Sequence, residues 1–175
     1  MNIRSKLRRI MLLAIPALAA ASLASAQTKL TGDGKCGKPD KQESVDVGDR
    51  TGHALALVHF SCTWATSFEM GGIKAKDYTG SFSADINGDK SQDRGYVVIT
   101  MENGDKAFVR FTGSTTTAKD GSSTGGGTWS YAGGTGKMKG LTGKGTYKST
   151  GTPDSGSDHI EGEYTLPAAP APKAK

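Results

Sequence analysis

The most constraining feature of the sequence is a glycine-rich stretch from Gly125 to Tyr147, GGGTWSYAGGTGKMKGLTGKGTY. Trp129 and Tyr131 lie two residues apart, so on an extended chain their side chains share one face. The glycines that follow are typical of a turn that needs positive φ; they are Gly133, Gly134 and Gly136. The stretch therefore predicts strand, turn and strand, with a structural role for these three glycines.

The same glycines do not match a nucleotide-binding loop. A phosphate loop needs a glycine, four residues and then Gly-Lys followed by Ser or Thr. Here Gly136-Lys137 is followed by Met138, and Gly143-Lys144 is followed by another glycine. No long apolar helix follows that would offer its N-terminus to a phosphate. We therefore expect no nucleotide at this turn.

Residues 1–26 have the organisation of a secretory signal peptide. Four basic residues precede an apolar run from Ile10 to Ala21, and Ala24-Ser25-Ala26 provides a small-residue cleavage site. The apolar run is shorter than the roughly 18 to 20 residues that span a bilayer. We expect an exported chain, periplasmic or secreted, that begins at Gln27 and has no membrane span.

The loss of this leader changes the charge of the chain. Its four basic residues and no acidic ones take the formal net charge from +5 to 18 minus 17, or +1. The remaining surface has mixed signs and no block of Lys and Arg, which argues against nucleic acid as a partner.

Two cysteines remain, Cys36 and Cys62. An even number of cysteines in an exported chain predicts a disulfide between them. Their spacing is not the Cys-x-x-Cys pattern of redox motifs.

Turn signals divide the chain after the leader at regular intervals. Asn87-Gly88, Asn103-Gly104 and Asp120-Gly121 are hairpin dipeptides, and Pro153 to Gly156 forms a further turn cluster. Sustained helical periodicity is missing from the sequence. Strands are predicted at 43–48, 53–64, 78–86, 94–102, 105–118, 124–132, 142–149 and 158–166.

Eight antiparallel strands with short connections close into a barrel, which removes exposed sheet edges. The fold prediction is thus all-β, with one eight-stranded antiparallel barrel over residues 27–166. Proline recurs every two or three residues in 167–175, which predicts an extended tail.

Apolar residues alternate with polar ones in several predicted strands, and this sets the inner face of the barrel. The inner sets are predicted to be the even positions of 54–64, 82–86 and 160–166 and the odd positions of 107–111. The strand from Tyr96 to Met101 is apolar on both faces. Such a strand is either covered on both sides or offers an apolar patch to a partner.

The turn Gly133-Gly134-Thr135-Gly136-Lys137-Met138, followed by Leu141 and Gly143, resembles a hairpin of the allene oxide cyclase and dirigent proteins. Those calycin-like eight-stranded barrels have Gly-Gly-Thr-Gly-x-Phe-x-x-Ala-x-Gly, so this chain departs from them at Met138 and Leu141. The chain as a whole also resembles a group of secreted bacterial proteins without an assigned function, through GKCGKPDK, VGDRTGH, CTW, TMENGDKA and EGEYTLP.

The resemblance implies a barrel whose interior handles a small molecule. Dirigent proteins bind phenolic radicals, and allene oxide cyclases steer a fatty-acid epoxide. The functional acidic and basic residues of those families match no position here, so none is carried over.

The histidines give little support to a metal site. His53 and His59 share a strand face but lie about 20 Å apart along it, and His159 can join only one of them. The segment 85–93 alternates oxygen side chains as a calcium loop does, but it has Lys90 where that loop needs glycine. We therefore expect no metal and no cofactor.

Glu161 and Glu163 share a face, which fits both an acid and base pair and a solvated strand. The aromatic residues that we expect to line a ligand cavity are Trp129, Tyr131, Tyr147 and Tyr164, although core packing uses the same residue types.

The sequence thus predicts a protein that binds a small apolar or amphipathic ligand inside the barrel. Two alternatives stay open. One is a cyclase or isomerase of the allene oxide cyclase kind, and the other is an interaction or structural module that uses the strand 96–101.

Overall fold

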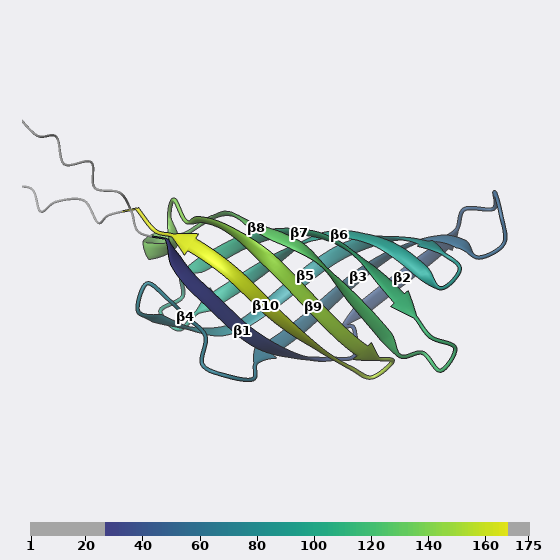
Figure 1. Ribbon diagram of the computed structural model, residues 1–175, viewed down its shortest axis with the longest axis horizontal. Helices are drawn as coiled ribbons and strands as arrows, with labels where there is room; N and C mark the ends of the chain where they lie inside the picture. The colour runs from purple at the N-terminus through teal and green to yellow at the C-terminus, as the bar shows by residue number, and fades with distance from the viewer. Residues whose placement is uncertain (1–26, 168–175) are drawn as a thin grey trace, which may run out of the picture.

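The computed structural model describes residues 27–167 and is all-β, as predicted, with one short 3₁₀ helix, η1 (Gly136–Met138) (Figure 1). Its strands are β1 (Thr28–Gly37), β2 (Lys41–Asp46), β3 (His53–Trp64), β4 (Glu69–Met70), β5 (Ile73–Asn87), β6 (Lys90–Met101), β7 (Lys106–Thr117), β8 (Ser123–Gly134), β9 (Thr142–Thr152) and β10 (Ser155–Thr165). The predicted leader, 1–26, and nearly all of the predicted tail lie outside the described residues. Within the described part, no helix is both long and apolar enough to cross a membrane.

Eight of the strands close into an antiparallel barrel, which confirms the predicted fold. The hydrogen-bonded order is β3, β1, β10, β9, β8, β7, β6 and β5, and β5 pairs with β3 to complete the circle. β2 and β4 are additional strands, paired with β3 and β5 respectively. Long, tilted strands connected by short hairpins give the elongated shape in Figure 1.

The first strand of the barrel is β1, and the sequence-based prediction that placed 43–48 among the eight barrel strands is wrong. β2 lies beside the first half of β3, beyond the point where β1 pairs with the second half, and all six of its residues are exposed. The sequence of β1 does not alternate between apolar and polar residues, because two of its inward positions are Gly32 and Gly34. The alternation that marks a strand is thereby lost from the sequence.

The predicted inner faces agree with the observed burial. On β3, Ala56, Val58 and Cys62 are buried, whereas Leu55 and Leu57, which have the opposite parity, are exposed. On β6 the apolar residues of the two faces lie in different surroundings. Ile99 and Met101 are buried in the interior, whereas Tyr96 is 64% exposed on the outer wall.

One end of the barrel is packed with large side chains. These residues come from β4, η1, the end of β6 and the loops before β4 and β9, and they are Phe68, Met70, Met101, Met138 and Leu141. All five are almost completely buried. The barrel is therefore closed at this end, where β4 lies in Figure 1.

The glycine turn after β8 is tied to the neighbouring turn between β6 and β7. Gly133 and Gly136 have φ of 118° and 52°, which side chains with a Cβ rarely adopt. The Lys137 N–H donates to the Asp105 carboxylate at 2.9 Å, and the Lys106 N–H donates to Thr135 Oγ1 at 2.8 Å. These bonds hold η1 against the closed end.

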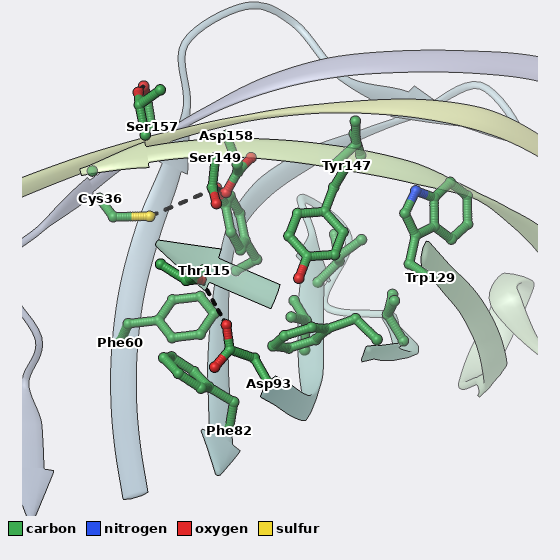
Figure 2. Close-up of a pocket in the computed structure, with 18 of the residues that line it drawn as sticks. Cys36, Phe60, Phe82, Asp93, Thr115, Trp129, Tyr147, Ser149, Ser157 and Asp158 are labelled. Atoms are coloured by element: carbon green, nitrogen blue, oxygen red, sulfur yellow. Dashed lines mark hydrogen bonds between the residues drawn. The ribbon is translucent and has the colours of Figure 1, made fainter. Parts of the chain in front are cut away.

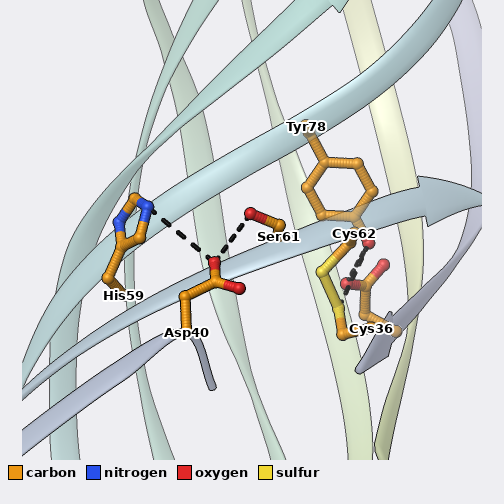
Figure 3. The surroundings of a disulfide bond; sticks show 7 residues. Cys36, Asp40, His59, Ser61, Cys62 and Tyr78 are labelled. Carbon is orange, nitrogen blue, oxygen red and sulfur yellow. Dashed lines mark hydrogen bonds and ion pairs between the residues drawn. A yellow bond between two sulfur atoms is a disulfide. The ribbon is translucent and has the colours of Figure 1, made fainter. Parts of the chain in front are cut away.

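The predicted disulfide is present between Cys36 and Cys62, which face each other on β1 and β3 (Figure 3). β1 pairs with β3 over only three residue pairs, whereas β3 pairs with β5 over eleven. The disulfide therefore reinforces the narrowest seam of the barrel.

Replacing both Cys36 and Cys62 with serine should lower the free energy of unfolding by about 3 kcal/mol, because the unfolded chain loses a loop closed across 26 residues. Urea unfolding followed by circular dichroism measures the change. The reduced, unmutated chain is the matched control and should lose a similar amount. A loss below about 1 kcal/mol in both would contradict a stabilising role for this bond.

Candidate ligand-binding site

The interior beyond the packed end contains a cavity of about 250 Å³. Every one of the eight barrel strands contributes to its wall. Aromatic and aliphatic side chains make up most of the lining, and the labelled rings in Figure 2 point into one space. A cavity of this kind holds one small ligand in an eight-stranded barrel.

A chain of aromatic contacts runs round the cavity wall. Phe82 lies 6.1 Å from both Phe60 and Phe111, measured between ring centroids, and Phe111 meets Tyr147 edge to face at 5.7 Å. Nearer the packed end, Trp129 and Tyr131 are also edge to face, at 5.1 Å. Such contacts fix the ring positions, so the wall is preformed.

Inward glycines make room for these rings. Phe60 is paired with Gly80 across the β3–β5 ladder, and Trp129 is paired with Gly145 across the β8–β9 ladder. A Cβ atom at Gly162 would lie 2.5 Å from Cζ2 of Trp129, closer than real Cβ atoms come to other atoms. The rings therefore lie directly over bare backbone, in space that a Cβ atom would otherwise need.

Asp93 on β6 is 7% exposed, which makes it the most deeply buried charged residue in the described part of the chain. Its carboxylate accepts hydrogen bonds from the Ser91 hydroxyl at 2.7 Å and the Thr115 hydroxyl at 2.6 Å. The Tyr147 hydroxyl lies over Gly113, where it would be too close to a Cβ atom if the glycine had one. Burial, and then the negative charge of Asp93, raise the pKa of Tyr147 to about 12.

Asp158 on β10 is the second carboxyl group of the cavity. The Tyr78 hydroxyl donates to its Oδ2 at 2.7 Å, beside the disulfide (Figure 3). Burial raises the pKa of Asp158, and the hydrogen bond from Tyr78 opposes this change only in part. Burial also raises the pKa of Tyr78, so this hydroxyl stays protonated and remains a donor.

Three of the four predicted aromatic residues, Trp129, Tyr131 and Tyr147, line this cavity together. Tyr164 does not belong to the lining, and its hydroxyl accepts a hydrogen bond from the Gly71 N–H at 3.0 Å. Trp129 Nε1 donates to the Thr146 carbonyl at 3.0 Å, and the Tyr131 hydroxyl donates to Met70 Sδ at 2.9 Å. The polar atoms of Trp129 and Tyr131 are thus bonded to the protein, and their rings form part of the cavity wall.

Sequence reasoning missed Asp93 and Asp158, although the pattern contained them. Val97, Ile99 and Met101 define the inner face of β6, and counting back in twos reaches Asp93. The inner set of 160–166 reaches Asp158 in the same way. Both residues lie beside turns, where polar character is expected in any case.

The three histidines lie in separate places, each beside a carboxylate. His53 contacts Asp49 and Asp85, and His59 lies 3.9 Å from Asp40. His159 bonds Asp33 at 2.6 Å and then Glu161 at 3.2 Å, and these two bonds raise its pKa. The Glu163 side chain is also away from the cavity and accepts a hydrogen bond from Gln27.

Within residues 27–167, one group has three metal-ligating atoms close together: Cys36, Cys62 and Asp158. The two sulfur atoms are bonded to each other, so neither is a thiolate that binds a metal. The segment 85–93 does not form a calcium loop, because it runs from the end of β5 into β6 and Asp93 turns inward.

Comparisons with known proteins do not assign the chain to a family. A scan against protein-family models finds no match, and a search of curated proteins finds no significant match. What the structure shows is the eight-stranded antiparallel barrel, and no family is identified for the chain.

Asp158 should make the native chain relatively more stable in acid. Its pKa is raised in the folded state, so this contribution is fully present below the ordinary value of 3.8 and is lost as the pH rises through the raised value. Asp158→Asn removes the titration. The free energy of unfolding of the Asp158→Asn variant, minus that of the native chain, should therefore increase as the pH rises from about 3 to about 7.

Urea unfolding across this pH range measures the difference. Asp154→Asn, in the exposed turn between β9 and β10, is the matched control for loss of a surface carboxylate. A difference for Asp158→Asn that stays constant or falls as the pH rises would contradict the raised pKa.

Proposed function

We propose that this chain is an exported binding protein that holds one small apolar or amphipathic molecule inside its barrel. The observation that carries the proposal is the aromatic cavity of about 250 Å³, to which all eight strands contribute. A side-chain-filled barrel would serve stability better, because an unfilled apolar space forfeits packing contacts. The cavity thus costs stability that ligand binding offsets.

The expected affinity follows from the apolar area that a ligand buries. A molecule that buries about 250 Å² of its own apolar surface gains roughly 6 kcal/mol before the cost of association. A gain of this size alone corresponds to a dissociation constant of about 40 μM, and the cost of association weakens binding, so we expect dissociation constants from tens of micromolar upwards. Recognition by ring faces tolerates related shapes, so we expect a group of similar molecules to bind.

Replacing Trp129 or Tyr147 with alanine should weaken ligand binding by at least about tenfold, because each ring forms part of the cavity wall. Isothermal titration calorimetry with fatty acids, phenolics, quinones and arylalkylamines measures the effect. Tyr96→Ala is the matched control, since this tyrosine is 64% exposed on the outer wall. Absence of saturable binding across the panel, or equal losses for Tyr96→Ala, would contradict the proposal.

One observation favours an isomerase or cyclase as the second candidate function. The Tyr78–Asp158 pair places a carboxyl group of raised pKa against an apolar cavity, which is an arrangement that general acids use. Liquid chromatography coupled to mass spectrometry, applied to the ligand after incubation, separates the two functions. A binding protein returns the molecule unchanged, whereas an isomerase alters its structure at constant mass, which chromatography resolves.

The outer face of β6 supports a third candidate, an interaction module. Tyr96 is highly exposed, and Val98 follows it on the same face of the strand. Loss of a partner from Tyr96→Ala with unchanged ligand binding would favour this function.

A further inference from the structure

We infer that the ligand of this barrel is an organic cation, a protonated amine with an aromatic or aliphatic body. The inference rests on the proposed binding function and specifies the charge of the ligand. It is carried by the two carboxyl groups of the cavity and by the absence of a positive partner for them in the cavity wall.

The Asp93 carboxylate is buried without a cation. Both of its oxygens are bonded to neutral hydroxyl groups, those of Ser91 and Thr115. Among the described residues, no lysine, arginine or histidine lines the cavity. A buried carboxylate costs several kcal/mol unless it is paired, so a positive group in the cavity would relieve this cost.

Asp158 faces the same space from the opposite wall. In the closed order of the barrel, three strands separate β10 from β6 in either direction. Figure 2 shows Asp158 and Asp93 in different parts of the wall, with the Phe60 ring beside Asp93 and Tyr147 to one side. A ligand in the cavity therefore lies between two acidic groups, and the carboxylate of a fatty acid would be repelled there.

The rings between the carboxyl groups suit a cation as well. Aromatic faces attract ammonium groups within about 6 Å of the ring centroid, and the attraction is strongest where water is excluded. Phe60, Phe82 and Tyr147 offer such faces beside Asp93. The body of the ligand would then lie towards Trp129 and Tyr131, whose polar atoms are already bonded to the protein.

Matched compounds test this charge directly on the unmutated chain. Phenylpropylamine, phenylpropanol and phenylpropionate share one shape and differ in the head group, and naphthylethylamine, naphthylethanol and naphthylacetate provide a second, wider set. Calorimetry at neutral pH should give at least about tenfold tighter binding for each amine than for its alcohol. Each carboxylate should bind more weakly than its alcohol.

Variants then assign the effect to the two aspartates. Asp93→Asn and Asp158→Asn should each reduce amine affinity by at least about tenfold and leave alcohol affinity within about threefold, which also shows that the cavity is intact. Asp46→Asn on the exposed strand β2 is the matched control and should change neither affinity.

Each remaining outcome overturns the inference in an identifiable way. If an alcohol or a carboxylate binds as tightly as its amine, or if the variants leave amine affinity unchanged, the cavity binds ligands but does not select cations. If no member of either set binds, and the wider panel of apolar compounds fails as well, the proposed binding function fails together with the inference.

Discussion

The interior of this barrel depends on the contact between inward aromatic rings and glycines one or two strands away. Phe60 lies over Gly80, Trp129 over Gly145 and Gly162, and Tyr78 over Gly34. In a barrel of eight strands the interior is just wide enough to be filled by side chains. Where an inward position is a glycine, a large ring from a nearby strand takes the space of the missing side chain and so lies along the wall.

This contact also explains the unusual composition of the strands. Glycine in a strand interior is unfavourable because it loses the most conformational freedom and provides no side chain to pack. The neighbouring rings supply the missing packing and cover the exposed backbone, as aromatic residues do for glycines in other sheets. The glycine content of the chain, 25 residues in all, is therefore part of how the cavity is made.

The same contact limits how far the sequence alone could predict the structure. Barrel closure was predictable, because turn dipeptides and period-two alternation mark seven of the eight barrel strands. β1 was not, since its inward Gly32 and Gly34 remove the alternation. Trp129, Tyr131 and Tyr147 were predictable as wall residues. Asp93 and Asp158 lie on the inner faces that the alternation marks, but a carboxylate near the end of a strand is equally typical of a solvated turn, so the pattern alone did not single them out.

Charge is distributed unequally between the two faces of the barrel. The histidines and most carboxylates lie outside, where His53, His59 and His159 each contact an acidic side chain. Inside, Asp93 and Asp158 have hydroxyl partners and no cation among the residues that line the cavity. Acidic side chains on the surface thus have histidine partners, whereas the two in the cavity have none, and this difference is the basis of the inferred cationic ligand.

The most direct test is a crystal structure of the oxidised chain with phenylpropylamine. The account predicts density for the aromatic ring inside the barrel, beside Trp129, with the nitrogen within hydrogen-bond distance of Asp93 or Asp158. Density for the amine only on the outer surface, or an interior filled by repacked side chains, would contradict it.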